Sequence, residues 1–153
     1  MASPTVDDER TIRAIVGACE AAWNEGDAAA FTAEMAEDVD FINVVGEHHQ
    51  GRATVERGHR HIFDTIYKES RVRSAIEDIR FIRPDVALVF IHARLNARVR
   101  LSAIAAATRP VQMSDENQES EARPTMVMRK DDGRWRIVAF QNTSVATMAT
   151  ARA

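Results

Sequence analysis

The sequence predicts one α+β domain, in which helices in the first part of the chain cover one face of a curved antiparallel sheet. Apart from a short strand pattern at 39–45, apolar residues recur every three or four positions up to about residue 70, which is typical of helices. Afterwards they recur at alternate positions, which is typical of half-buried strands. Helices followed by a run of strands are typical of the α+β class. Because 153 residues suit a single domain, we expect one domain over residues 1–153.

The first two helices are predicted by their capping residues. Thr5 is a favourable N-cap with Asp8 three residues later, and Gly26 is suited to the left-handed conformation that ends a helix. Asp27 can cap a short second helix. The apolar stripe expected on that second helix consists of Ala28, Phe31, Thr32 and Met35.

The segment from Val39 to Tyr67 points to a binding pocket. A strand is expected at 39–45, with Phe41 and Asn43 on its inward side, and Gly51 opens a helix that we expect to reach Ser70. One stripe of that helix combines a histidine with apolar residues: Val55, His59, Ile62, Phe63 and Ile66. An apolar wall that carries a few polar groups is typical of a small-molecule pocket.

Four strands complete the expected fold. Alternation and turn residues place them at 72–82, 87–101, 125–130 and 135–143, with a hairpin turn at Asp131-Asp132-Gly133. A bulge in the first of these strands would explain its offset pattern. In the last strand Gln141 continues the inward face of Trp135 and Ile137.

The acidic segment 109–123 interrupts the strand pattern. It is predicted to be a solvated, mobile loop, with a functional lid as the alternative. The small, polar tail 146–153 is expected to fray.

Composition narrows the classes of function. The net charge of −3 argues against nucleic acid as a partner, and the chain has no apolar run of the ~20 residues needed to span a membrane. One cysteine, Cys19, fits a reducing compartment, and the first residues lack the apolar core of a signal peptide. A cytoplasmic protein is therefore expected.

His59 is the candidate catalytic residue, because histidine titrates near neutrality and can act as a general acid or base. The alternative is a structural histidine bonded to a neighbouring group. The expected ligand-binding residues are aromatic or carry amide or imidazole groups: Trp23, Phe41, Asn43, His49, Phe63, Tyr67, Gln141 and Asn142. The aromatic members could equally be core, and the amides could be satisfied within the protein.

No metal or organic cofactor is expected. The neighbours His48 and His49 would point to opposite sides of an extended segment, so only one of them would line the pocket rim. The chain has no HExxH motif or Cys/His ligand spacing, and no GxGxxG follows a strand.

Five motifs, read together, resemble the nuclear-transport-factor-2-like superfamily, and most closely its SnoaL-like and SgcJ/EcaC-type members. They are WNEGDAAAF at 23–31, AEDVDFINVVG at 36–46, QGRATVERGHRHIF at 50–63, RPDVALV at 83–89 and DGRWRIVAFQNTSV at 132–145. The resemblance implies a cone-shaped sheet wrapped around three N-terminal helices, a cavity at the open end, and a homodimer formed through the sheet.

Three positions carry residues that differ from those expected in relatives, and they bear on the activity. Cys19 stands where ketosteroid isomerases, similar in fold, place an oxyanion-hole tyrosine, and Ile42 or Asn43 stands near their general-base aspartate. Gln141 stands where closer relatives tend to carry histidine. Steroid isomerisation is therefore not expected.

We expect a protein that binds a small apolar or carbonyl-bearing ligand in a mostly apolar pocket. If it is an enzyme, it is a cofactor-independent proton-transfer catalyst in which His59 moves the proton and Asn43 and Gln141 orient the substrate. The alternative is a non-catalytic homodimeric module with a vestigial cavity. The outer face of the strand at 87–101 is interpreted as a dimer interface or a polar sheet face.

Overall fold

The computed structural model describes residues 3–97 and 119–145 of the chain. The helices in these ranges are α1 (Val6–Glu25), α2 (Ala28–Thr32) and α3 (Arg52–Asp64). The strands are β1 (Met35–Ile42), β2 (His48–Gln50), β3 (Arg71–Arg83), β4 (Val86–Asn96), β5 (Glu119–Ala122), β6 (Thr125–Asp131) and β7 (Arg134–Gln141).

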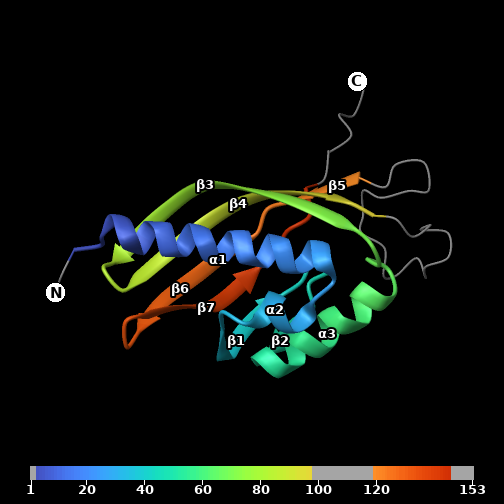
Figure 1. Cartoon of the computed structure of the whole chain (residues 1–153), viewed down its shortest axis with the longest axis horizontal. Coiled ribbons are helices and arrows are strands. Elements are labelled where there is room, and N and C mark those ends of the chain that lie inside the picture. The colour runs from blue at the N-terminus through green and yellow to red at the C-terminus, as the bar shows by residue number, and fades with distance from the viewer. Residues whose placement is uncertain (1–2, 98–118, 146–153) are drawn as a thin grey trace, which may run out of the picture.

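The strands form one curved sheet in the order β2-β1-β7-β6-β4-β3, with β5 also paired to β4 (Figure 1). The helices lie on one face of this sheet. The predicted α+β fold is therefore confirmed. The sheet is mixed, because β1 runs parallel to β7 while the other neighbours are antiparallel.

Local signals define α1 as predicted. Thr5 and Asp8 form a reciprocal capping box at its start, and Gly26 adopts φ 67° at its end. Asp8 is also buried and accepts hydrogen bonds from Lys130 Nζ at 2.8 Å and from Trp135 Nε1 at 2.9 Å. The beginning of α1 is thereby tied to the β6–β7 hairpin.

Two predicted helix ends are wrong. Met35 is not on α2: it begins β1, where it is fully buried and pairs with Ile137. The third helix ends at Asp64 rather than Ser70, and a turn follows in which the amide of Tyr67 donates to the carbonyl of Ile62 at 2.8 Å. Pairing and packing between distant segments decide both boundaries, and helical periodicity does not report them.

The strand predictions need three corrections. The strand expected at 39–45 begins at Met35 and ends at Ile42, and the short β2 was not predicted. The sequence places Glu119–Ala122 in the mobile loop, but these residues form β5, which pairs with β4 from Ala93 to Asn96. The expectations for 98–101, for the rest of the acidic loop at 109–118 and for the tail at 146–153 lie outside the described residues.

The bulge suspected in β3 is confirmed, since Ile76 pairs with Ile91 and Asp78 with Phe90, which leaves Glu77 without a partner position. Within the described ranges β3 is an edge of the sheet. Polar side chains of α1 cover the first part of this edge. Asn24 accepts from the amide of Val72 and donates to its carbonyl, and Glu20 accepts from the amide of Ser74.

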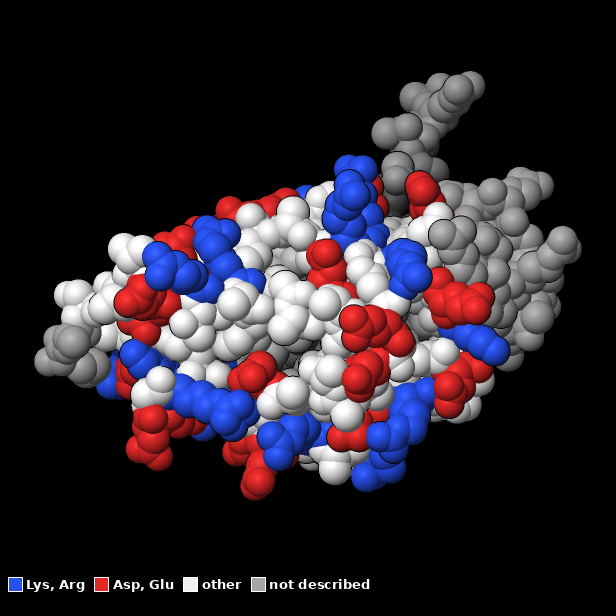
Figure 2. Space-filling view, viewed as in Figure 1, with Lys and Arg blue, Asp and Glu red and all other residues white. Residues whose placement is uncertain are grey.

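Charges of both signs are interspersed on the face shown in Figure 2, without a continuous basic region among its described residues. No helix within residues 3–97 and 119–145 is long and apolar enough to cross a membrane.

Candidate ligand cavity

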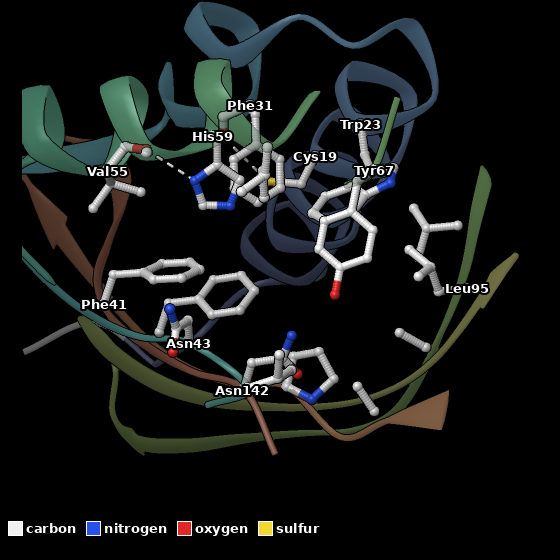
Figure 3. A pocket seen from close by; sticks show the side chains of 18 of the residues that line it. Cys19, Trp23, Phe31, Phe41, Asn43, Val55, His59, Tyr67, Leu95 and Asn142 are labelled. Carbon is white, nitrogen blue, oxygen red and sulfur yellow. Dashed lines mark hydrogen bonds between the residues drawn. The ribbon is translucent and has the colours of Figure 1, made fainter. Parts of the chain in front are cut away.

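A cavity of about 480 Å³ lies between the helices and the concave side of the sheet (Figure 3). All three helices and most strands contribute to its wall. The wall is mainly apolar and includes Phe31, Phe41, Ile91, Leu95, Met126 and Phe140. Stacking of the Phe41 and Phe140 rings, with centroids 4.7 Å apart, joins the parallel strands β1 and β7 in this wall.

His59 lines the cavity from α3 and is only 7% exposed. Its Nδ1 lies 2.9 Å from the carbonyl oxygen of Val55, one turn earlier in the helix. The imidazole stacks on Phe31 at 4.4 Å and meets the edge of Phe41 at 5.1 Å. Within the described chain Nε2 has no hydrogen-bond partner, and in Figure 3 it is turned toward the open space.

Burial lowers the pKa of His59 from 6.5 to about 4, although the bond to Val55 opposes this shift. The imidazole is therefore neutral at pH 7. Since a carbonyl oxygen can only accept, Nδ1 carries the proton and Nε2 presents a lone pair.

Trp23 is the centre of an aromatic cluster beside His59. Its ring contacts Phe63 with centroids 5.0 Å apart and Tyr67 at 5.4 Å, and its Nε1 donates to the hydroxyl of Ser70 at 2.9 Å. Trp23 and Tyr67 line the cavity, whereas Phe63 packs behind Trp23 and is not in the wall. The expected contacts of these residues with a ligand stay predictions.

Tyr67 and Asn142 face the cavity from opposite sides (Figure 3). Burial raises the pKa of Tyr67 to about 12, so its hydroxyl is neutral and can donate. The side-chain Oδ1 of Asn142 is buried without a partner among the described residues. Its main-chain amide donates to the carbonyl of Ile42 at 2.9 Å, which holds Asn142 just beyond β7.

His49 lines the rim, and His48 does not. His49 pairs across the strands with the buried Phe41, so both side chains share the inner face. His48 lies on the outer face, where its Nε2 is 2.8 Å from Asp40.

Asn43 also borders the cavity, but its side chain organises the turn between β1 and β2. Its Oδ1 accepts from the amides of Val45 and Glu47, and its Nδ2 donates to the Glu47 carboxylate at 2.8 Å. The role expected for Asn43 in orienting a substrate therefore has little support, because these bonds already use most of its amide.

Gln141 is exposed and lies outside the cavity wall, so its predicted inward orientation is wrong. The reason is a bulge: Ile137 pairs with Met128 and Ala139 with Val127, which leaves Val138 as an extra residue. The alternation shifts by one position after Val138. Phe140, for which the sequence predicts no role in the pocket, consequently occupies the inward place.

Cys19 lines the cavity with a buried thiol. Its Sγ lies 3.7 Å from the carbonyl oxygen of Phe31, and burial, with a smaller contribution from Glu34, raises its pKa to about 12. The thiol is thus protonated at neutral pH.

No group of three or more His, Cys, Asp or Glu side chains in the described part of the chain is arranged to hold a metal ion. The polar groups that reach the cavity can bind through hydrogen bonds and can transfer a proton at His59.

Comparison with known proteins agrees with this architecture. The SnoaL-like domain family matches residues 12–148. No curated protein matches the chain.

Three solved structures illustrate the similarity of the fold. A domain of unknown function with a cystatin-like fold from Nostoc punctiforme is 29% identical, with a TM-score of 0.77 over 94% of this chain and 81% of that chain. An uncharacterised protein with a cystatin-like fold from Caulobacter vibrioides is 27% identical, with a TM-score of 0.75 over 90% of this chain and 89% of the other.

A ketosteroid isomerase-like protein from Erwinia carotovora has a TM-score of 0.70 at 15% identity, over 94% of this chain and 100% of its own, and so shares the fold alone. The family match extends over most of the sequence. This chain therefore belongs to the SnoaL-like domain family of the nuclear-transport-factor-2-like superfamily.

Proposed function

We propose that this protein binds a small, mostly apolar carbonyl compound and catalyses proton transfer beside its carbonyl group. The observation that carries the proposal is Nε2 of His59, which has no hydrogen-bond partner among residues 3–97 and 119–145 and lies in the wall of an apolar cavity of about 480 Å³. A cavity of this size and character is typical of small-molecule sites.

The proposed chemistry needs only the side chains in the cavity. A C–H bond next to the carbonyl breaks, its proton moves to Nε2 of His59, and its electron pair passes to the carbonyl oxygen as an enolate. The neutral hydroxyl of Tyr67 donates to that oxygen. Return of a proton from His59 to carbon completes the exchange, so the residues end unchanged.

The low pKa of His59 has two opposing effects on this chemistry. It keeps Nε2 unprotonated throughout the neutral range, which a base requires, but it also makes Nε2 a weak base. We therefore expect the protein to accelerate proton exchange beside the carbonyl of simple ketones only modestly.

Hydrogen–deuterium exchange of 1-tetralone tests the proposal. The ketone has exchangeable protons only on the carbon next to its carbonyl, and NMR in D₂O follows their loss. Wild-type protein should accelerate exchange about 10²-fold over buffer. The His59→Gln variant should still bind 1-tetralone but lose most of the acceleration. Equal rates in wild type and variant would exclude His59 as the base.

One observation favours a second candidate, a binding module without catalysis. His59 is packed between Phe31 and Phe41 and bonded to Val55, as a structural histidine would be. Binding of 1-tetralone with no accelerated exchange would support this candidate, whereas failure to bind 1-tetralone would contradict both candidates.

A further inference from the structure

The burial of His59 hinders the passage of a proton from its side chain to solvent. Only 7% of the residue is exposed, its Nδ1 is bonded to the carbonyl of Val55, and its Nε2 faces the cavity (Figure 3). Once protonated, an imidazole with a pKa of about 4 is a strong acid beside a basic enolate, so it returns the same proton to carbon quickly. Exchange with solvent therefore needs a second group that takes the proton from His59 before it returns.

His49 is a proton-accepting side chain placed between His59 and solvent. It pairs across β1 and β2 with Phe41, so both side chains lie on the inner face of the sheet. The Phe41 ring in turn meets His59 with centroids 5.1 Å apart. The side chain of His49 is 31% exposed and lines the cavity at its rim. It thus borders both the space that His59 faces and the solvent outside.

The two imidazoles influence each other's charge. Burial is the main cause of the lowered pKa of His59, and a positive charge on His49 lowers that pKa further. Two groups coupled in this way hold one proton more readily than two. A proton that His59 gains is therefore more easily passed on than kept beside a second one.

The turn between β1 and β2 holds a carboxylate beside His49. Oε2 of Glu47 lies 3.5 Å from Nε2 of His49 and accepts from Nδ2 of Asn43 at 2.8 Å. Oδ1 of Asn43 accepts from the main-chain amides of Val45 and Glu47, so the turn and its carboxylate are fixed together. The negative charge of Glu47 attracts the imidazolium that forms when His49 receives a proton.

We infer that His49 is the proton relay of this cavity, which takes the proton from His59 and releases a proton to solvent at the rim. The N–H bond at Nε2 of His59 breaks and an N–H bond forms at one ring nitrogen of His49, while the other ring nitrogen gives its proton to water. A water molecule in the space that both side chains line can bridge them. The inference rests on the proposed function, because it assumes that His59 removes a proton from the ligand.

The His49→Gln variant tests the relay through the exchange of 1-tetralone in D₂O. Glutamine keeps a polar side chain at the rim but takes no proton at neutral pH. By calorimetry the variant should bind 1-tetralone as the wild type does, yet exchange should be about tenfold slower. Imidazole added to the buffer should restore the rate, because it replaces the missing ring. After subtraction of the protein-free rate, the same addition should leave wild-type exchange nearly unchanged.

Two further variants separate the relay from a structural effect on the hairpin. His48→Gln is the matched control, because His48 adjoins His49 in β2 but lies on the outer face beside Asp40. It should exchange 1-tetralone at the wild-type rate, with or without imidazole. Glu47→Gln keeps an acceptor for Asn43 and removes the negative charge, so it should give an intermediate rate.

The outcomes distinguish the relay from the proposed function. Wild-type exchange in His49→Gln, a loss that imidazole does not restore, or an equal loss in His48→Gln would overturn the relay and leave the proposed function standing. Wild-type exchange that itself rises severalfold with imidazole would also overturn the relay, and this measurement needs no variant. No acceleration by the wild type, or equal rates in wild type and His59→Gln, would overturn the proposed function and the relay with it.

Discussion

His59 donates through Nδ1 to the carbonyl oxygen of Val55, and this one contact sets the chemistry that the histidine can perform. It fixes the tautomer, so the lone pair is on Nε2, at the cavity wall. It also fixes the plane of the ring against Phe31. A hydrogen bond that looks structural is therefore also the one that would orient a base.

Acid should destabilise the fold through His59 between pH 6.5 and about 4. The folded-state pKa lies below the unfolded value of 6.5, so the unfolded chain binds the proton more readily in this window. The contribution of neutral His59 to the free energy of unfolding is fully present above pH 6.5. It decreases as pH falls toward 4, by roughly 3 kcal/mol for a shift of this size. Urea unfolding at several pH values measures the effect.

The His59→Gln variant is the control for this prediction, because it keeps the carboxylates and removes the titrating group. Its stability should change much less than that of the wild type between pH 6.5 and 4. Parallel curves for the two proteins would contradict the buried, neutral state of His59.

Asp8 should control stability at lower pH. Its hydrogen bonds from Lys130, Trp135 and Thr5 lower its pKa below the ordinary 3.8. The stabilisation is therefore present above pH 3.8 and is lost as pH falls below it. Asp8→Asn should lower the unfolding free energy at pH 7 by about 2–3 kcal/mol, because charged hydrogen bonds are lost. The unfolding free energy of this variant should also depend less on pH below pH 4. An unchanged pH dependence in that range would refute this role of Asp8.

Cys19 should resist thiol reagents in the folded protein. With a pKa of about 12 instead of 9, its thiolate fraction at pH 8 is about a thousandfold smaller. Ellman's reagent should therefore label Cys19 in urea but hardly at all in buffer. Rapid labelling of the native protein would show that the cavity admits the reagent and that the thiol is not desolvated.

The outer face of β4 carries a row of half-buried apolar side chains, Val86, Leu88 and Phe90. We expect this face to pair two copies of the chain, as proposed from the sequence. Light scattering at micromolar concentration should give twice the monomer mass, and Leu88→Glu should give a monomer with unchanged circular dichroism. A monomeric wild-type protein would contradict the proposal.

Much of the fold was predictable because its signals are local. The Thr5–Asp8 capping box and Gly26 mark the ends of α1, and the alternation around Val89 marks β4. The fold class follows from the order of such signals.

The site was only partly predictable. His59, Tyr67 and Asn142, which the sequence selects, line the cavity, while their part in binding or catalysis stays a prediction. Phe140 takes the inward place expected of Gln141 because of a bulge at Val138. That bulge depends on the register with β6, which periodicity along one strand does not reveal. Phe63 lies behind the wall for a related reason, since a helical stripe does not distinguish the wall of a cavity from the layer behind it.

The contacts of Asn24 with Val72 have a consequence for how this protein behaves at high concentration. An uncovered edge strand offers a template on which another chain can add a strand, which begins aggregation. Here the amide side chain of Asn24 imitates such an added strand, since it both accepts from and donates to the same residue of β3. Helix α1 thus covers the first part of this edge, and the exposed part of β3 around Ile82 is left as the segment from which misassembly would start.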